Sequence, residues 1–199
     1  ARNLDNLLFI IFCMMRLEFM ERQQTLTICK GGSQALVLLG ESEEKREQES
    51  PDGEKTEVTV YVYDATWLDL TKQHDPVAAA REEVLKQIAA YDTSSAVNGF
   101  VLNGAEVWLD FELRDRVYQG NERLQRIGRT DTTLWLGKQC YNLSIEQAQN
   151  IISHIEAYAK DCYNVTAAHK KAVAELTDIA EVLTYDYTKG YPAKRTMTV

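Results

Sequence analysis

The sequence contains none of the short motifs that mark common nucleotide-binding or catalytic sites. It has no GxGxxG pattern, no P-loop and no GxSxG turn, and its three histidines form no HExxH pair. Glu112 and Glu146 recur at equivalent positions, but each lies in the first turn of an expected helix, where the helix dipole favours a negative charge. We therefore predict a protein that is not an enzyme and that uses no cofactor and no metal.

The sequence also lacks paired cysteines and an excess of basic residues. Cys13, Cys29, Cys140 and Cys162 are far apart, which favours reduced thiols over a metal or redox site. The chain has 22 lysines and arginines against 30 acidic residues, a net charge of −8. This balance argues against a nucleic-acid backbone as partner.

No apolar run is long enough for a transmembrane helix, which needs about 20 residues. The run over residues 7–15 is the longest candidate, and we interpret residues 1–20 as an N-terminal extension with a natural start at Met14, Met15 or Met20. A membrane or signal role for this run is the less favoured alternative.

Residues 21–70 are predicted to form a small β module. Residues 57–63 alternate valine with threonine and tyrosine, which is typical of a strand. Residues 41–55 contain seven acidic residues, three basic residues and no apolar one, so we expect a solvated, mobile acidic loop there. Asp75-Pro76 then predicts the start of a linking helix over residues 75–92.

Residues 97–185 are predicted to form a domain that contains an internal duplication. Residues 102–112 align without a gap to residues 136–146, 34 positions later. Asn103-Gly104 is a strong signal for a type I′ hairpin turn, and Gly137-Lys138 holds the equivalent place. Each copy should therefore be a hairpin followed by a helix, with Asp110 and Ser144 as the N-caps and Gln147 completing a capping box with Ser144. The turns set Phe100 opposite Val107, and alternation puts Leu102, Leu109, Leu136 and Leu143 on the apolar inner faces. Gly120-Asn121 is expected to break the first of these helices.

The second helix carries a heptad seam, beginning at Ile145 and widened by Ile151 and Tyr158. The same phase continues through Thr166 and His169, which predicts that the helix runs past Asn164. The seam can pack within the chain or against other copies of it, which leaves a homo-oligomer open. A short helix capped by Thr177 should complete a C-terminal helical hairpin, and residues 186–199 should form an extended arm.

Five residues are candidates for a protein–protein interface, because exposed aromatic and apolar side chains mark such surfaces. Trp108 and Trp135 fall on the outer faces of the two hairpins, although packing under a helix is an equal alternative for both. The full candidate set is Trp108, Trp135, Tyr61, Ile151 and Tyr158.

Residues 76–192 resemble a domain of unknown function found in phage and prophage tail-region proteins, in or beside tail fibres and tail-fibre assembly proteins. The stretches that carry the resemblance are YDTSSAVNGF (residues 91–100), LNGAEVWLD (102–110), TTLWLG (132–137), CYNVTAAHK (162–170), YDY (185–187) and GYP (190–192). Residues 111–128 depart from the pattern by being more charged. The resemblance implies a genomic setting and supplies no active site.

Taken together, these patterns predict an α+β protein with a small N-terminal β module, a linking helix, a duplicated ββα unit and a C-terminal helical hairpin. The resemblance implies a non-catalytic structural protein of a phage tail or tail fibre, with other tail proteins as partners. Its location would be the virion tail, or the host cytoplasm during assembly. The alternatives are a tail-fibre assembly chaperone that is absent from the mature virion, and a prophage remnant with an enzymatic role.

Overall fold

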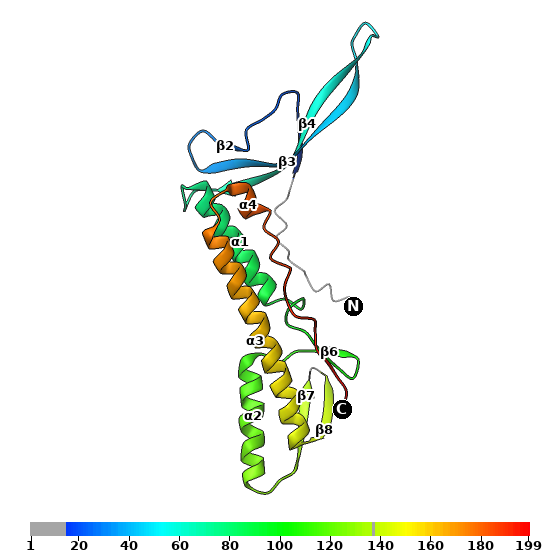
Figure 1. The fold of residues 1–199 in the computed structure, drawn as a ribbon, viewed down its shortest axis with the longest axis vertical. Helices are drawn as coiled ribbons and strands as arrows, with labels where there is room; N and C mark the ends of the chain where they lie inside the picture. The colour runs from blue at the N-terminus through cyan, green and yellow to red at the C-terminus, as the bar shows by residue number, and fades with distance from the viewer. Residues whose placement is uncertain (1–14, 137) are drawn as a thin grey trace. The chain divides into compact units, whose positions relative to one another are not determined.

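The computed structural model describes residues 15–136 and 138–199, and this part of the chain is a mixed α+β protein with nine strands in three sheets and four helices (Figure 1). The apolar run over residues 7–14 lies outside the described residues. The chain divides into two compact units. Unit 1 contains the residues up to Gln87 together with Ala172–Tyr185, and unit 2 contains Ile88–Lys171 and Asp186–Val199. This division differs from the predicted one, because residues 172–185 belong with the N-terminal strands.

Unit 1 contains a four-stranded antiparallel sheet with the order β1-β4-β3-β2. Its strands are β1 (Met15–Phe19), β2 (Leu26–Ile28), β3 (Gln34–Glu49) and β4 (Lys55–Asp69). Strand β1 pairs with β4, so the predicted boundary of the extension at residue 20 is wrong and the β module includes Met15–Phe19.

The prediction of a mobile loop over residues 41–55 is also wrong. Residues 41–49 continue β3, residues 50–54 form a turn, and Lys55 opens β4. The two strands pair in register from Ser42↔Val62 to Glu49↔Lys55. Figure 1 shows the resulting two-stranded ribbon, which we call the charged ribbon (residues 42–62), extending beyond the ends of β1 and β2.

Complementary charges explain why a segment without apolar residues is ordered. Arg46 donates from Nη1 and Nη2 to the two carboxylate oxygens of Glu18, each at 2.8 Å, and from Nη2 to Glu44 Oε2 at 2.8 Å. Since β4 lies between β1 and β3, this bridge from Arg46 to Glu18 passes over β4, where Val60 is only 8% exposed. The valines of the partner strand supply the apolar surface that residues 41–55 lack.

The helices of unit 1 begin at side-chain caps. Helix α1 (Pro76–Asp92) starts as predicted, with Asp75 Oδ1 accepting from Val77 N at 3.0 Å. Helix α4 (Ile179–Leu183) is capped by Asp178, whose side chain accepts from Ala180 N and Glu181 N, so the predicted cap at Thr177 is wrong. The carboxylate accepts both bonds from the first turn and also favours the positive end of the helix dipole.

Unit 2 contains two hairpins, each followed by a helix. The elements are β5 (Phe100–Leu102), β6 (Ala105–Val107), α2 (Phe111–Arg126), β7 (Asp131–Leu136), β8 (Gln139–Ser144) and α3 (Ile145–Glu175). Asn103 and Gly104 have φ values of 49° and 81°, as a type I′ turn requires. The predicted pairing of Phe100 with Val107 is confirmed.

Helix α2 runs without interruption through Gly120, so the predicted break is wrong. A glycine costs a helix only about 1 kcal/mol relative to alanine. The Asp110 side chain caps the first turn by accepting from Leu113 N at 2.8 Å, and Val117 packs against the core. These contacts outweigh the cost of one glycine.

Helix α3 begins with the predicted capping box. Ser144 Oγ accepts from Gln147 N at 3.1 Å, while Gln147 Oε1 accepts from Ser144 N at 2.9 Å. The helix then runs 31 residues, past Asn164, as the continuing heptad phase predicted.

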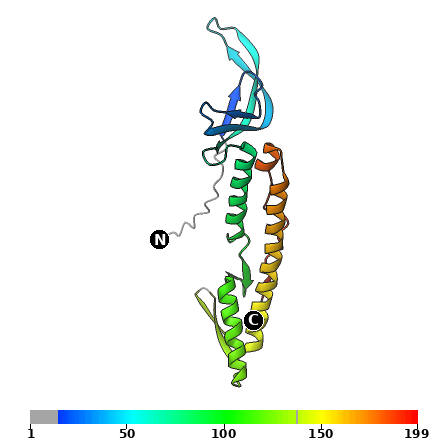
Figure 2. The same ribbon diagram turned by 90° about the vertical axis from the view of Figure 1, so that its left-hand side faces the viewer.

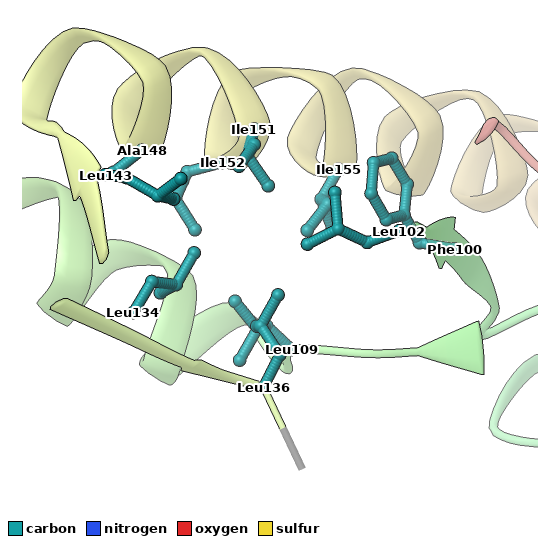
Figure 3. Packing of buried hydrophobic residues seen from close by; sticks show 10 residues of the cluster. All are labelled: Phe100, Leu102, Leu109, Leu134, Leu136, Leu143, Ala148, Ile151, Ile152 and Ile155. Carbon is teal, nitrogen blue, oxygen red and sulfur yellow. The ribbon is translucent and has the colours of Figure 1, made fainter. Parts of the chain in front are cut away.

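The core of unit 2 lies between α3 and the two hairpins (Figure 3). The equivalent pairs Leu102 and Leu136, and Leu109 and Leu143, are all buried, which confirms the predicted inner faces. The full cluster is Phe100, Leu102, Leu109, Leu134, Leu136, Leu143, Ala148, Ile151, Ile152 and Ile155.

The C-terminal arm, residues 186–199, ends in a short strand, β9 (Thr196–Met197). This strand pairs in parallel with β5, giving a sheet with the order β6-β5-β9. Val101 N donates to Arg195 O at 2.9 Å, and Asn103 N donates to Met197 O at 2.9 Å. The arm thus adds a third strand to the first hairpin.

Candidate functional site

Two of the five predicted interface residues lie in the core of unit 2. Ile151 is 0% exposed and Tyr158 is 1% exposed. Tyr158 donates its hydroxyl proton to Val97 O at 2.9 Å and packs with Val97 and Cys162. The prediction that these two residues form an intermolecular surface is therefore wrong, because the residues that widen the seam pack within the chain.

Trp108 packs against other side chains of the chain, which was the alternative to an exposed interface position. Its ring meets Tyr158 edge-on at 6.2 Å, and the guanidinium of Arg114 lies 5.4 Å from the Trp108 ring centroid. Arg114 is itself buried, and donates to Glu156 Oε2 at 2.7 Å and to Leu109 O at 2.6 Å. Trp108 is thus half-buried, packs against the edge of the core, and makes a cation–π contact with Arg114.

The other two candidates differ in exposure. Tyr61 is half-buried against the cluster of Leu38, Tyr63 and Ala65, and the Arg22 guanidinium lies 5.4 Å from its ring. Trp135 on β7 is 64% exposed. Trp135 therefore remains the strongest of the predicted interface residues.

The structure brings together a group of polar and aromatic residues that the sequence did not indicate as a site. We call it the tyrosine cluster: Tyr91, Asp92, Thr166, His169, Tyr187 and Tyr191. At its centre, the buried Thr166 donates to Asp92 Oδ1 at 2.6 Å, and its Oγ1 lies 2.9 Å from the Tyr191 hydroxyl. Three segments, at the end of α1, in the middle of α3 and in the arm, thereby meet at one hydroxyl.

Ring contacts surround this hydrogen-bonded centre. The Tyr91 ring centroid lies 5.7 Å from that of Tyr187 and 5.5 Å from that of Tyr191. The His169 ring lies 5.7 Å from Tyr191, and His169 Nε2 lies 2.8 Å from Lys189 O. The predicted seam position of His169 is thus a contact with the arm.

Burial raises the pKa of two phenols and of one thiol in and beside this cluster. Desolvation raises the pKa of Tyr191 and of Tyr187 above the usual phenol value. Desolvation also raises the pKa of the Cys162 thiol, next to the buried Tyr158. A protonated thiol and protonated phenols are poor nucleophiles and bases. The arrangement is suited to holding the arm in place rather than to acid–base chemistry.

Periodicity could not reveal this cluster, because its members are separated by up to 100 residues and lie on three elements. The signal present in the sequence is the concentration of tyrosines around the start of the arm, with Tyr187 and Tyr191 in the arm and Tyr185 directly before it. An arm of that composition has aromatic surface to bury, which an extended solvated tail would leave exposed.

Residues 15–136 and 138–199 contain neither a cluster of metal ligands nor a helix that could cross a membrane. No group of three or more histidine, cysteine, aspartate or glutamate residues there is placed to hold a metal ion. In the same residues, no helix combines the length and the apolar character needed to cross a bilayer.

Comparisons with protein-family models, with curated proteins and with solved structures found no match to this chain.

Proposed function

We propose that this chain is a non-catalytic structural protein associated with a phage tail or tail fibre. The observation that carries the proposal is where the stretches of resemblance lie in unit 2. Tyr91 and Asp92, Thr166 and His169, and Tyr187 and Tyr191 come from separate stretches and all contribute to the tyrosine cluster. Residues from separate stretches of the resemblance thus contact one another in the folded chain. This supports membership of the tail-region family, because the resemblance then includes residues that pack together across long sequence distances.

The same proposal includes an internal duplication of a ββα unit. In support, the paired residues that flank each connection, Leu102↔Ala105 and Leu136↔Gln139, hold equivalent positions 34 residues apart in the sequence. The helix that follows each hairpin begins at an equivalent cap, Asp110 or Ser144. A duplicated scaffold of this kind presents surfaces in place of a catalytic centre.

Exposed aromatic side chains supply surface for permanent contacts with other tail proteins. Trp135 is 64% exposed and Phe111 is 69% exposed, and both belong to unit 2. Aromatic residues of this size are enriched in the central part of protein–protein interfaces. These exposed rings support our proposal that the protein is part of the virion, where it would bind other tail proteins.

Mass spectrometry of gradient-purified particles tests this proposal directly. We expect peptides from this chain in the finished particles, at a fixed ratio to known tail proteins and resistant to a high-salt wash. A cytoplasmic protein of the same producing cells serves as the contamination control. Abundance in infected cells with absence from finished particles would contradict the structural role.

That second outcome would favour a tail-fibre assembly chaperone, which must remain dissolved when free and bind reversibly. The charged ribbon and the net charge of −8 support this alternative. A pull-down with the tail-fibre protein from infected-cell extract, compared with one from purified particles, separates the two roles.

A further inference from the structure

The two hairpins of unit 2 differ in how their edges are covered. The first is a three-stranded sheet, because β9 of the arm pairs with β5. The second, β7 with β8, has two strands in the part of the chain that the structure describes. The first hairpin thus shows what binds at the outer edge of β5, while no strand of the described residues lies beside β7.

Register shows that the two edges are equivalent. In a hairpin closed by a two-residue turn, the residues that flank the turn exchange hydrogen bonds, and the next residue back points its N–H outward. In the first hairpin that residue is Val101, and its N–H does donate to Arg195 O of the arm at 2.9 Å. In the second hairpin it is Trp135, 34 residues later, and Thr133 has the same outward orientation.

The side chains beside the two edges differ in a way that excludes the chain's own arm from β7. The side chain of Lys194 packs directly against Gly99, so that a Cβ added to Gly99 would lie 2.5 Å from Lys194 Cε. Lys194 Nζ also donates to Glu106 Oε1 at 2.7 Å. The equivalent positions on the second hairpin are Thr133 and Cys140. A lysine there would meet the β-branched side chain of Thr133, and Cys140 offers no carboxylate in the place of Glu106.

We propose that the open edge of β7, Thr133–Leu136, binds an extended segment of a partner protein as a parallel β-strand. The segment carries a small, uncharged residue beside Thr133 and an apolar residue beside Leu136. The second requirement follows from the first hairpin, in which the apolar Met197 lies beside Leu102, the residue equivalent to Leu136. Backbone hydrogen bonds to Trp135 supply the attachment, and the exposed Trp135 ring contacts the segment's outer face. The proposal rests on the duplicated unit described above and assigns the surface through which that scaffold joins a partner.

Binding of two synthetic peptides to the purified full chain, measured by calorimetry, tests the side-chain rule. One peptide has the sequence of residues 191–199, and the other is the same peptide with Lys194→Ala. We expect the Lys194→Ala peptide to bind about fivefold more tightly, the effect of removing one unfavourable cross-strand pair. Equal affinities, or no binding of either peptide, would overturn the proposal.

Two proline variants test which edge is used. Thr133 and Asn142 are cross-strand neighbours with a side-chain contact of 3.4 Å, so both variants lose that contact. Thr133→Pro removes an N–H from the β7 edge and should abolish binding of the Lys194→Ala peptide, whereas Asn142→Pro alters the β8 edge and should leave it intact. Circular dichroism of both variants controls for folding, and loss of binding only in Asn142→Pro would overturn the proposal.

A gain of binding cannot arise from misfolding and is the sharpest test. The double variant Thr133→Gly with Cys140→Glu rebuilds the Lys194 site of the first hairpin on the second. We expect it to bind the unmodified peptide at least as tightly as the Lys194→Ala peptide. Failure to reverse the preference would overturn the side-chain rule. Because these measurements use the isolated protein, they stand whether or not the chain is found in finished particles.

Discussion

The charged ribbon and the C-terminal arm are both largely polar and are ordered by different forces. Residues 42–55 of the ribbon and the whole arm lack the apolar pattern that normally predicts structure. The ribbon is ordered by ion pairs between exposed side chains, such as Lys45 with Glu57 at 2.6 Å. The arm is ordered by half-buried tyrosine rings and by the buried hydroxyl of Thr166. Polar segments can therefore be ordered through exposed charges or through buried hydroxyl groups, and the two kinds of order should respond differently to salt, pH and mutation.

The largest effect should come from removing the ring that anchors the arm. Tyr191→Ala deletes the ring contacts with Tyr91 and His169 together with the hydroxyl contact with Thr166. Since the ring is half-buried, we expect a loss of about 2–4 kcal/mol in the free energy of unfolding, measured with urea. Tyr163→Ala, on a residue of α3 that is 65% exposed, is the control and should change it by less than about 0.5 kcal/mol. Equal effects of both variants would show that the arm is not held by the cluster.

Removing only the central hydroxyl should cost less. Thr166→Val keeps the side-chain volume but leaves Asp92 and the Tyr191 hydroxyl without their shared partner. We expect a loss of about 1–3 kcal/mol, because buried polar groups lose a hydrogen bond. Limited proteolysis should also cut at Lys189 or Lys194 sooner than in the unmodified protein. The exposed Thr177→Val is the matched control, and unchanged cleavage in Thr166→Val would contradict the role of the hydroxyl.

A still smaller and purely local effect is expected in the ribbon. Arg46→Met keeps the long stem of the side chain but removes the bonds to Glu18 and Glu44. Hydrogen exchange of the ribbon amides should become severalfold faster, while the global unfolding midpoint stays unchanged, because exposed ion pairs contribute little. Lys30→Met in an exposed turn is the control.

Salt extends the same test to the unmodified protein. Raising ionic strength to about 1 M shortens the Debye length to about 3 Å, which should speed exchange in the ribbon and leave the arm unaffected. Salt-independent exchange in the ribbon would mean that backbone pairing alone keeps it ordered.

The sequence predicted those parts of the fold in which local signals agree. Asn103-Gly104, the Ser144 capping box and the alternation that buries Leu102 and Leu136 all depend on neighbours in the chain, and all are found as expected. The ribbon could not be predicted in this way, because Arg46 finds Glu18 28 residues away on another strand. The same reason hid the tyrosine cluster and the pairing of β9 with β5, which depend on contacts between distant segments.

Candidate interface residues were harder to predict, because residues on one predicted face can have different surroundings. Trp108 and Trp135 hold nearby positions in the two hairpins, yet Trp108 packs on Tyr158 and Trp135 is exposed. Periodicity indicates a face but does not show what covers that face.

The smallest expected effect is a difference in acid sensitivity between the two segments. In the ribbon, the hydrogen bond from Arg46 lowers the pKa of Glu44 below its ordinary value of 4.5. In the arm, hydrogen bonds from Thr188 and then Lys189 lower the pKa of Asp186 from 3.8 to about 2. A carboxyl whose pKa is lowered by folding stabilises the folded state above its unfolded pKa, and this contribution disappears as the pH falls through its folded pKa.

The ribbon should therefore begin to loosen as the pH falls below about 4.5, while the turn that begins the arm keeps its charge until close to pH 2. Carboxyl ¹³C shifts of Glu44 and Asp186, followed from pH 6 to pH 2 together with amide exchange in each segment, measure this order. Arg46→Met should raise the pKa of Glu44 toward its ordinary value, although Arg16 still lowers it, and should leave Asp186 unchanged. Simultaneous loosening of both segments would contradict the distinction, since it would mean that one acid transition controls the ribbon and the arm alike.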